Sequence, residues 1–155
     1  MPDTLTEGDR HLLDAAIAQA EKSRREGGIP IGAALGTGDG TVLAVGHNLR
    51  VQTGDTTAHA ETVCLRHAGR RRDWPALTLA TTLSPCAMCA GATVLHQIGR
   101  VVIGEHQNYL GREDWLAAEG ARLILADDER CKIMMAEFIL QHPELWAEDI
   151  GEPHA

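Results

Sequence analysis

Apolar residues recur every three to four positions over residues 8–26. The positions that follow this spacing are Leu12, Leu13, Ala16, Ile17 and Ala20. The pattern predicts an amphipathic helix, and the pair Gly27-Gly28 predicts its end. Two short apolar runs follow at 29–35 and 41–45, separated by a segment rich in Gly and Asp. Such a segment between two apolar runs predicts a β-hairpin.

Strand-like and helix-like segments alternate along the rest of the chain. The pattern predicts helices at 58–68, 85–97 (opened by Pro85) and 128–141, and strands at 76–82, 100–104 and 121–126. This alternation is typical of an α/β protein. We therefore predict one domain over residues 1–155, a three-layer α/β/α sandwich around a mixed five-stranded sheet. Its first two strands should be antiparallel and its later strands parallel.

Composition and charge restrict the partners. The 155 residues can bury roughly 70% of the surface that the unfolded chain exposes. With 14 Lys and Arg against 22 Asp and Glu, the net charge is −8, which makes nucleic acid an unexpected partner. The polar, acidic start does not resemble a secretory signal, and no apolar run approaches the ~18 residues of a membrane span. We expect a cytoplasmic protein that does not enter a membrane.

Two short motifs carry metal chemistry. His59-Ala60-Glu61 opens the second predicted helix, and Pro85-Cys86-Ala87-Met88-Cys89 opens the third. Residues three apart on a helix share a face, and the first turn of a helix favours thiolates. One imidazole and two thiolates form a three-ligand set for Zn²⁺ that leaves the fourth position open, as in catalytic zinc sites.

Glu61 is the candidate proton carrier. It stands two positions beyond His59, a spacing that places a carboxylate beside the metal and not on it. From there it can take a proton from water and pass it to a substrate nitrogen. General acid–base catalysis of this kind typically adds ~10²–10⁴ in rate.

Each motif alone has a simpler interpretation. A Cys-x-x-Cys pair can be a redox pair or two buried thiols, and His-x-Glu by itself carries little information. In this order, each at the start of a helix, they match the signature of zinc deaminases. A thioredoxin-like protein has no use for the upstream His-Ala-Glu. Cys64 and Cys131 have no partner at ligand spacing, so we predict that they are small buried residues.

The chain resembles the cytidine-deaminase-like superfamily, and within it the small fungal-type cytosine deaminases. The similar segments are 27–32 (GGIPIG), 46–48 (GHN), 59–61, 81–89 (TTLSPCAMC), 127–131 (DDERC) and 146–152 (WAEDIGE). The zinc motif is shared by the whole superfamily. The C-terminal segment occurs in a much smaller part of the superfamily, and it indicates the enzymes that act on free bases.

The resemblance implies a cytidine-deaminase-like fold and a role for each matching residue. His59, Cys86 and Cys89 would bind one Zn²⁺ per chain, and Glu61 would be the proton shuttle. The positions it assigns to the substrate are Ile31, Asn48, Ser84, Tyr109, Trp146 and Asp149. Asn48 would hold the pyrimidine carbonyl, the backbone at Leu83 and Ser84 would face the leaving amine, and Trp146 and Asp149 would close the pocket. The family also implies a homodimer.

One departure from the family bears on the substrate. Tyr109 stands where the fungal enzymes have Phe, and the segment 110–119 also differs. A buried hydroxyl needs a hydrogen-bond partner, so Tyr109 could bind a polar group that cytosine lacks.

The function we favour is hydrolytic deamination of a small free heterocyclic base, cytosine first, with a role in pyrimidine salvage. The same chemistry on creatinine, isocytosine or a guanine-like ring is the nearest alternative. A tRNA adenosine deaminase would have the same zinc motif, but it needs a basic surface. A zinc-stabilised binding module without catalysis would need neither an open metal position nor Glu61.

Overall fold

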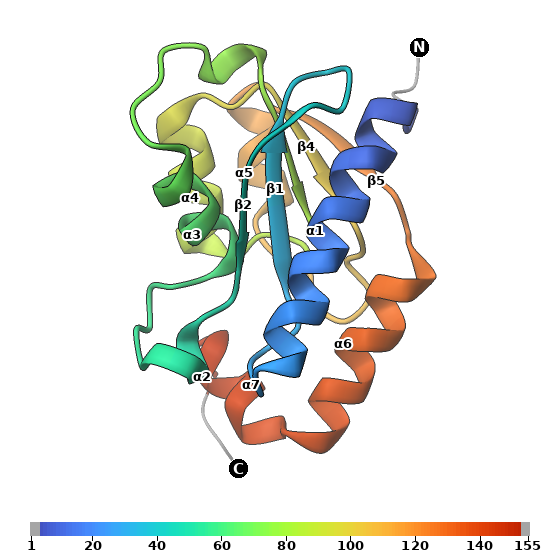
Figure 1. Ribbon diagram of the computed structural model, residues 1–155, viewed down its shortest axis with the longest axis vertical. Helices are drawn as coiled ribbons and strands as arrows, with labels where there is room; N and C mark the ends of the chain where they lie inside the picture. Colours follow the sequence, from blue (N-terminus) through green and yellow to red (C-terminus); the bar gives the residue numbers. More distant parts are fainter. Residues whose placement is uncertain (1–3, 153–155) are drawn as a thin grey trace.

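The computed structural model describes residues 4–152, in which five strands form one mixed sheet (Figure 1). The strands are β1 (Gly32–Gly36), β2 (Val42–His47), β3 (Thr78–Thr81), β4 (Arg100–Ile103) and β5 (Arg122–Leu125). Their order across the sheet is β2-β1-β3-β4-β5. Strand β1 pairs antiparallel with β2 and β3, whereas β3, β4 and β5 are parallel. The predicted mixed sheet is confirmed.

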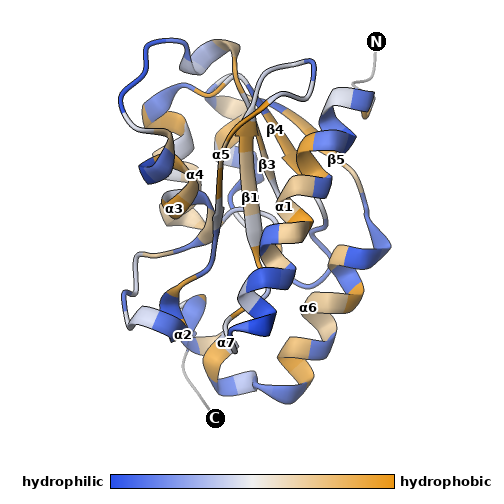
Figure 2. Cartoon of the chain, in the orientation of Figure 1, coloured by the Kyte–Doolittle hydropathy of each residue, from blue (hydrophilic) through white to orange (hydrophobic). Residues whose placement is uncertain are grey.

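Helices cover both faces of the sheet, so the predicted three layers are confirmed. Helices α1 (Glu7–Arg25) and α6 (Glu129–Gln141) lie on one side, and α3 (Ala60–Ala68) and α4 (Ala87–His96) on the other (Figure 1). Alternating strand residues enter separate cores: Leu35 and Leu79 on one face, Ala34, Ala80 and Val102 on the other. Figure 2 shows the matching pattern on α1, where apolar and polar patches alternate.

Two glycines let helices approach the sheet closely. A Cβ on Gly32 would lie 1.9 Å from the Ala16 carbonyl oxygen of α1. A Cβ on Gly46 would lie 2.4 Å from the Cys64 backbone nitrogen of α3. Both helices therefore pack directly against strand backbone, and this contact fixes the start of α3 beside the end of β2.

Helix α1 has a capping box that the sequence pattern did not reveal. The Thr6 hydroxyl accepts from the Asp9 backbone N–H, and the Asp9 carboxylate accepts from the Thr6 N–H. The same buried carboxylate accepts two hydrogen bonds from Arg100, at 2.9 and 2.6 Å. These contacts fasten the first turn of α1 to β4, and the helix lies within one residue of its predicted range.

Four further elements connect the layers: α2 (Arg50–Thr53), the 3₁₀ turn η1 (Trp74–Ala76), α5 (Glu113–Ala118) and α7 (Pro143–Asp149). The pattern did not predict α2, η1 or α5, because three to six residues are too few to show helical periodicity. Among the described residues, no helix has the length and apolar character needed to cross a membrane.

Two helix starts differ from the prediction. Helix α3 begins at Ala60 and not near residue 58, and α4 begins at Ala87 and not at Pro85. His59 and Cys86 are the N-cap residues, with extended backbone (ψ 160° and 176°). Neither side chain caps its own helix, so the usual Ser, Thr, Asp or Asn signal is missing from the sequence. Both side chains are free to face the site instead.

Candidate active site

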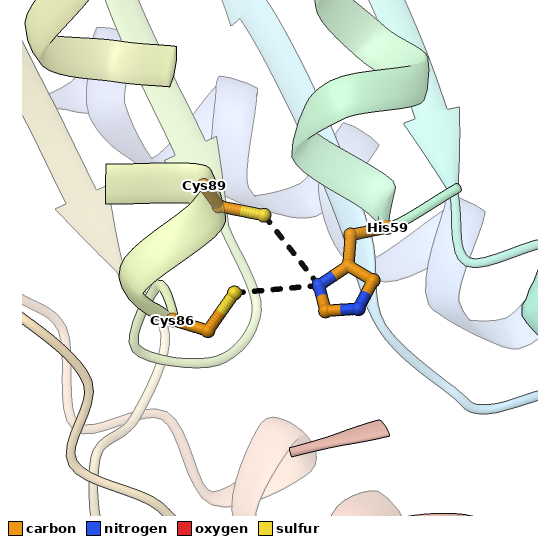
Figure 3. A group of neighbouring side chains, drawn as sticks. All are labelled: His59, Cys86 and Cys89. Carbon is orange, nitrogen blue, oxygen red and sulfur yellow. Dashed lines mark hydrogen bonds between the residues drawn. The ribbon is translucent and has the colours of Figure 1, made fainter. Parts of the chain in front are cut away.

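The starts of α3 and α4 bring the three predicted metal ligands together. His59 lies at the start of α3, Cys86 at the start of α4 and Cys89 in its first turn (Figure 3). Both Sγ atoms lie 3.5 Å from His59 Nδ1. The three ligand atoms fall within 4.8 Å of one another, and His59 and Cys89 are buried. One imidazole and two thiolates at this separation fit a tetrahedral Zn²⁺ with one open position.

The other ring nitrogen of His59 has a carboxylate partner. His59 Nε2 lies 3.2 Å from Asp149 Oδ1, and the Asp149 side chain is buried. A metal-binding histidine usually gives its second N–H to such a carboxylate, which fixes its tautomer and orientation. Asp149 therefore fits a supporting role at the metal as well as a place in the pocket.

Protons on the ligands compete with a metal for this site. Burial alone lowers the pKa of His59, but the hydrogen bonds with Asp149 and Cys86 outweigh it and raise the pKa to about 10. The hydrogen bond from Cys89, together with His59, lowers the pKa of Cys86 to about 4, whereas the same bond and burial raise that of Cys89. A metal must displace the protons on His59 Nδ1 and Cys89, so its affinity falls as the pH falls.

Glu61 is the second residue of α3 and lies outside the metal-binding set. Its side chain is only 4% exposed and lines the cavity next to the ligands. Burial, followed by the negative charge on Cys86, raises the pKa of Glu61 to about 7. A carboxyl group with this pKa can both accept and give up a proton near neutral pH.

The cavity beside the ligands has a volume of about 290 Å³, which includes space at its mouth that is open to solvent. It is lined by all six positions assigned to the substrate, together with His59, Glu61, Leu83, Cys86 and Ile150. Ile150 was not predicted as a site residue. Ile150 directly follows Asp149 in the segment 146–152 that resembles the free-base enzymes, and its position next to Asp149 is the feature of the sequence that could have indicated it.

Asn48 is completely buried at the end of β2, and its side chain has defined partners. Its Oδ1 accepts from the Arg50 backbone N–H at 2.9 Å, and its Nδ2 donates to Asp149 Oδ1 at 3.2 Å. Asp149 Oδ1 is thus shared by Asn48 and His59. One Nδ2 hydrogen of Asn48 remains for a ligand, since an amide group has two.

Two aromatic rings form the outer wall of the cavity. Tyr109 and Trp146 meet edge to face, with ring centroids 5.8 Å apart and an interplanar angle of 89°. Trp146 also packs in the core that contains Phe138, so it is both a pocket residue and a core residue. Burial, followed by the charge on Cys86, raises the pKa of Tyr109, so its hydroxyl stays protonated.

The Ser84 side chain is turned toward α5. Its Oγ donates to Glu113 Oε2 at 2.6 Å and accepts from the Gly111 N–H at 2.9 Å. His106 Nδ1 lies 3.1 Å from the same Glu113 oxygen. Glu113 and His106 were missed, because nothing in the local spacing connects them to a serine more than twenty residues earlier. With its hydroxyl engaged, Ser84 offers the cavity its backbone.

A three-layer sandwich with a His/Cys/Cys set and a buried glutamate at two helix starts is the arrangement of zinc-dependent deaminases. The chain belongs to the cytidine and deoxycytidylate deaminase family, whose zinc-binding region matches residues 6–105. Membership makes the protein a zinc-dependent hydrolase of the deaminase class.

Relatives extend the comparison over the whole chain. Cytosine deaminase of Candida albicans is 44% identical over 150 residues, which cover 96% of this chain and 100% of that protein. The tRNA-specific adenosine deaminase of Haemophilus influenzae is 35% identical over 79% of this chain and 69% of its own.

Two solved structures have the same fold. A tRNA:A34 deaminase has a TM-score of 0.71 and 27% identity, with 81% of this chain and 99% of that chain covered. Guanine deaminase from Nitrosomonas europaea has a TM-score of 0.67 at 23% identity, with coverage of 89% and 87%. At 23% identity, the similarity to the guanine deaminase concerns the fold alone.

Proposed function

We propose that this protein converts free cytosine and water into uracil and ammonia. The observation that carries the proposal is the small size of the cavity beside the metal ligands, which all six proposed substrate-binding residues line. Its volume is only about 290 Å³ even when the space at its mouth that is open to solvent is counted. Tyr109, Trp146 and Ile150 line it together with His59 and Cys86. Similarity to Candida albicans cytosine deaminase over almost the whole chain supports the same substrate.

The proposed chemistry divides between the metal and Glu61. Bound at His59, Cys86 and Cys89, zinc would supply a nucleophile by lowering the pKa of a water molecule to about 7. Glu61 takes one proton of the attacking water to ring N3 of the base, and it then carries the proton of the new hydroxyl on C4 to the amino nitrogen. The C–N bond then breaks, ammonia leaves, and the new C–O bond becomes the second carbonyl of uracil.

Other residues hold the base. Asn48 donates its remaining Nδ2 hydrogen to the pyrimidine carbonyl, and Asp149 accepts a ring N–H with its second oxygen. The backbone at Leu83 and Ser84 faces the leaving amine. The side chains of Ile31, Tyr109 and Trp146 form the apolar walls, which exclude bulk water from the reacting atoms.

Tyr109 supports one alternative, the same reaction on a different small ring. Its hydroxyl remains a hydrogen-bond donor, and no hydrogen bond from it to another described residue is found. A ring with an additional acceptor, such as creatinine, isocytosine or a guanine-like base, could use it. The net charge of −8 argues against tRNA as the substrate.

A substrate panel tests the proposal. We expect kcat/KM for cytosine to exceed that for cytidine at least ~tenfold, because the small cavity favours a single ring over a ring that carries ribose. Ammonia release is measured with cytosine, cytidine, isocytosine, guanine and creatinine at equal concentrations. Equal rates with cytosine and cytidine would overturn the free-base proposal. Activity on creatinine or isocytosine without cytosine would establish the alternative.

The proposed partner is a second copy of the same chain. Met88, Gly91 and Leu95 follow one another at successive turns along one face of α4. Met88 and Leu95 are exposed there, Leu95 to 79%. Leu110, in the adjoining loop, is also exposed. A helix that is apolar on its outer face is usually covered by another surface. The proposed homodimer is cytoplasmic and serves pyrimidine salvage.

Light scattering tests the dimer. We expect the parent protein to have twice the chain mass of 16.7 kDa, and Leu95→Glu to shift it toward the monomer, because a charge would be buried at the interface. Leu140→Glu is the matched control, since Leu140 is 84% exposed on α6, which covers the opposite face of the sheet. A dimer unaffected by Leu95→Glu would exclude this face as the interface.

A further inference from the structure

The backbone carbonyl of Asn48 is held by two side chains that do not line the active-site cavity. Ser23, near the end of α1, donates its hydroxyl to the Asn48 oxygen at 2.8 Å. Gln52, in α2, donates its Nε2 to the same oxygen at 3.1 Å. Ser23 is completely buried, so neither hydroxyl nor carbonyl competes with bulk solvent. A peptide group with two such donors is fixed in orientation.

The orientation of the Gln52 amide follows from its neighbours. Nε2 lies 3.2 Å from Glu26 Oε1, 3.1 Å from Ser23 Oγ and 3.1 Å from the Asn48 oxygen. A carboxylate and a carbonyl can only accept, so the amide nitrogen must face them. Gln52 Oε1 is then left buried, without a hydrogen-bond partner among the described residues. A buried acceptor without a partner costs free energy of folding. The hydrogen bonds that Gln52 Nε2 donates must compensate for this cost.

Two neighbours keep Gln52 in this place. A Cβ on Gly28 would lie 2.2 Å from Gln52 Nε2, so only glycine leaves room for the amide. Glu26 also accepts from His47 Nε2 at 2.9 Å, and this bond, together with the one from Gln52, lowers the pKa of Glu26. The carboxylate therefore stays charged and keeps drawing the amide nitrogen toward it.

We infer that Ser23 and Gln52 are positioning residues, which set substrate affinity by fixing the peptide of Asn48. The Asn48 side chain is attached to the Cα that borders this peptide group, and its free Nδ2 hydrogen is available to the cavity. A small rotation of the peptide moves that hydrogen away from the substrate carbonyl, while the metal ligands and Glu61 stay where they are. This inference rests on the proposed role of Asn48 in binding the base.

Steady-state kinetics test the effect on affinity. Gln52→Leu keeps the approximate shape of the side chain and removes both N–H donors of its amide. We therefore expect KM for cytosine to rise about three- to tenfold while kcat changes less than about twofold. Ser23→Ala should act in the same direction. Thr53→Ala is the control on the same short helix: the Thr53 hydroxyl bonds to Leu49 and Asp55 and not to Asn48, so this variant should leave KM unchanged. Unchanged KM in Gln52→Leu, or an equal loss in Thr53→Ala, would overturn the inference.

A second measurement does not depend on the substrate. The sequence has two asparagines, Asn48 and Asn108, so ¹⁵N-asparagine labelling marks two side-chain amide groups, each with a pair of N–H signals. In Gln52→Leu, we expect the Asn48 Nδ2 hydrogens to exchange with solvent at least about threefold faster, with a shifted resonance. Asn108, bonded to Glu105 and Lys132, should not change and is the internal control.

The two measurements separate the possible failures. If the parent protein does not deaminate cytosine but the Asn48 signal responds to Gln52→Leu, the proposed substrate is wrong and the positioning role stands. If cytosine is deaminated and the Asn48 signal is identical in parent and variant, the positioning role is wrong.

Discussion

Glu61→Gln is expected to lower kcat by about 10²–10⁴ and to leave zinc bound. Gln has nearly the same size and still accepts a hydrogen bond, but it cannot carry a proton between water and the leaving amine. The carboxyl group it replaces is buried, with a pKa raised to about 7, and lies outside the metal-binding set. The variant therefore removes proton transfer and leaves the three ligands in place.

Zinc content separates this effect from loss of the site. We expect Glu61→Gln to retain about one zinc per chain by elemental analysis, with turnover measured as ammonia release under saturating substrate. Cys89→Ser is the contrasting variant: it removes a buried ligand, and it should lose both the metal and the activity. Turnover near the parent rate in Glu61→Gln would exclude Glu61 as the proton carrier.

The metal-binding set could be predicted because its residues lie in short motifs of the sequence. Cys86 and Cys89 lie within one turn of each other, and His59 and Glu61 are two residues apart, so short motifs define most of the geometry. The helices that carry them could be placed within about two residues, but their first residues could not. His59 and Cys86 occupy N-cap positions without capping their helices, and so they lack the side chains by which such positions are recognised.

The supporting contacts were not predictable from spacing, because they join distant segments. Asp149 reaches His59 across ninety residues, and Ser84, in the loop before α4, reaches Glu113 in α5. Gln52 lies on a helix of four residues that shows no periodicity. The resemblance to known deaminases supplied Asp149, but only as a residue that closes the pocket. Its contact with the metal ligand follows from the fold of α7 against the start of α3.

Asp149→Asn is expected to weaken zinc binding by about 10–100-fold, because Asp149 contacts a metal ligand in addition to its proposed role in binding the substrate. Asp149 Oδ1 accepts from both His59 Nε2 and Asn48 Nδ2, and the side chain is buried. Asn keeps the shape but loses the charge that favours the His59 tautomer with its proton on Nε2. A substitution is a cleaner test than truncation of α7, because Trp146 belongs to the core and its removal would disturb the fold.

The measurement is zinc affinity by competition with a chelator, in parallel with kcat/KM at saturating zinc. Glu148→Gln, the exposed neighbour on the same helix, loses the same charge and should keep the parent affinity. If saturating zinc restores the full kcat/KM of Asp149→Asn, the carboxylate acts through His59 alone. If zinc affinity is unchanged and kcat/KM falls, Asp149 serves only the substrate, and the 3.2 Å contact with His59 is not a determinant of metal binding. A loss in both, only partly restored by zinc, is the result expected from one oxygen shared between the metal ligand and the residue that holds the base.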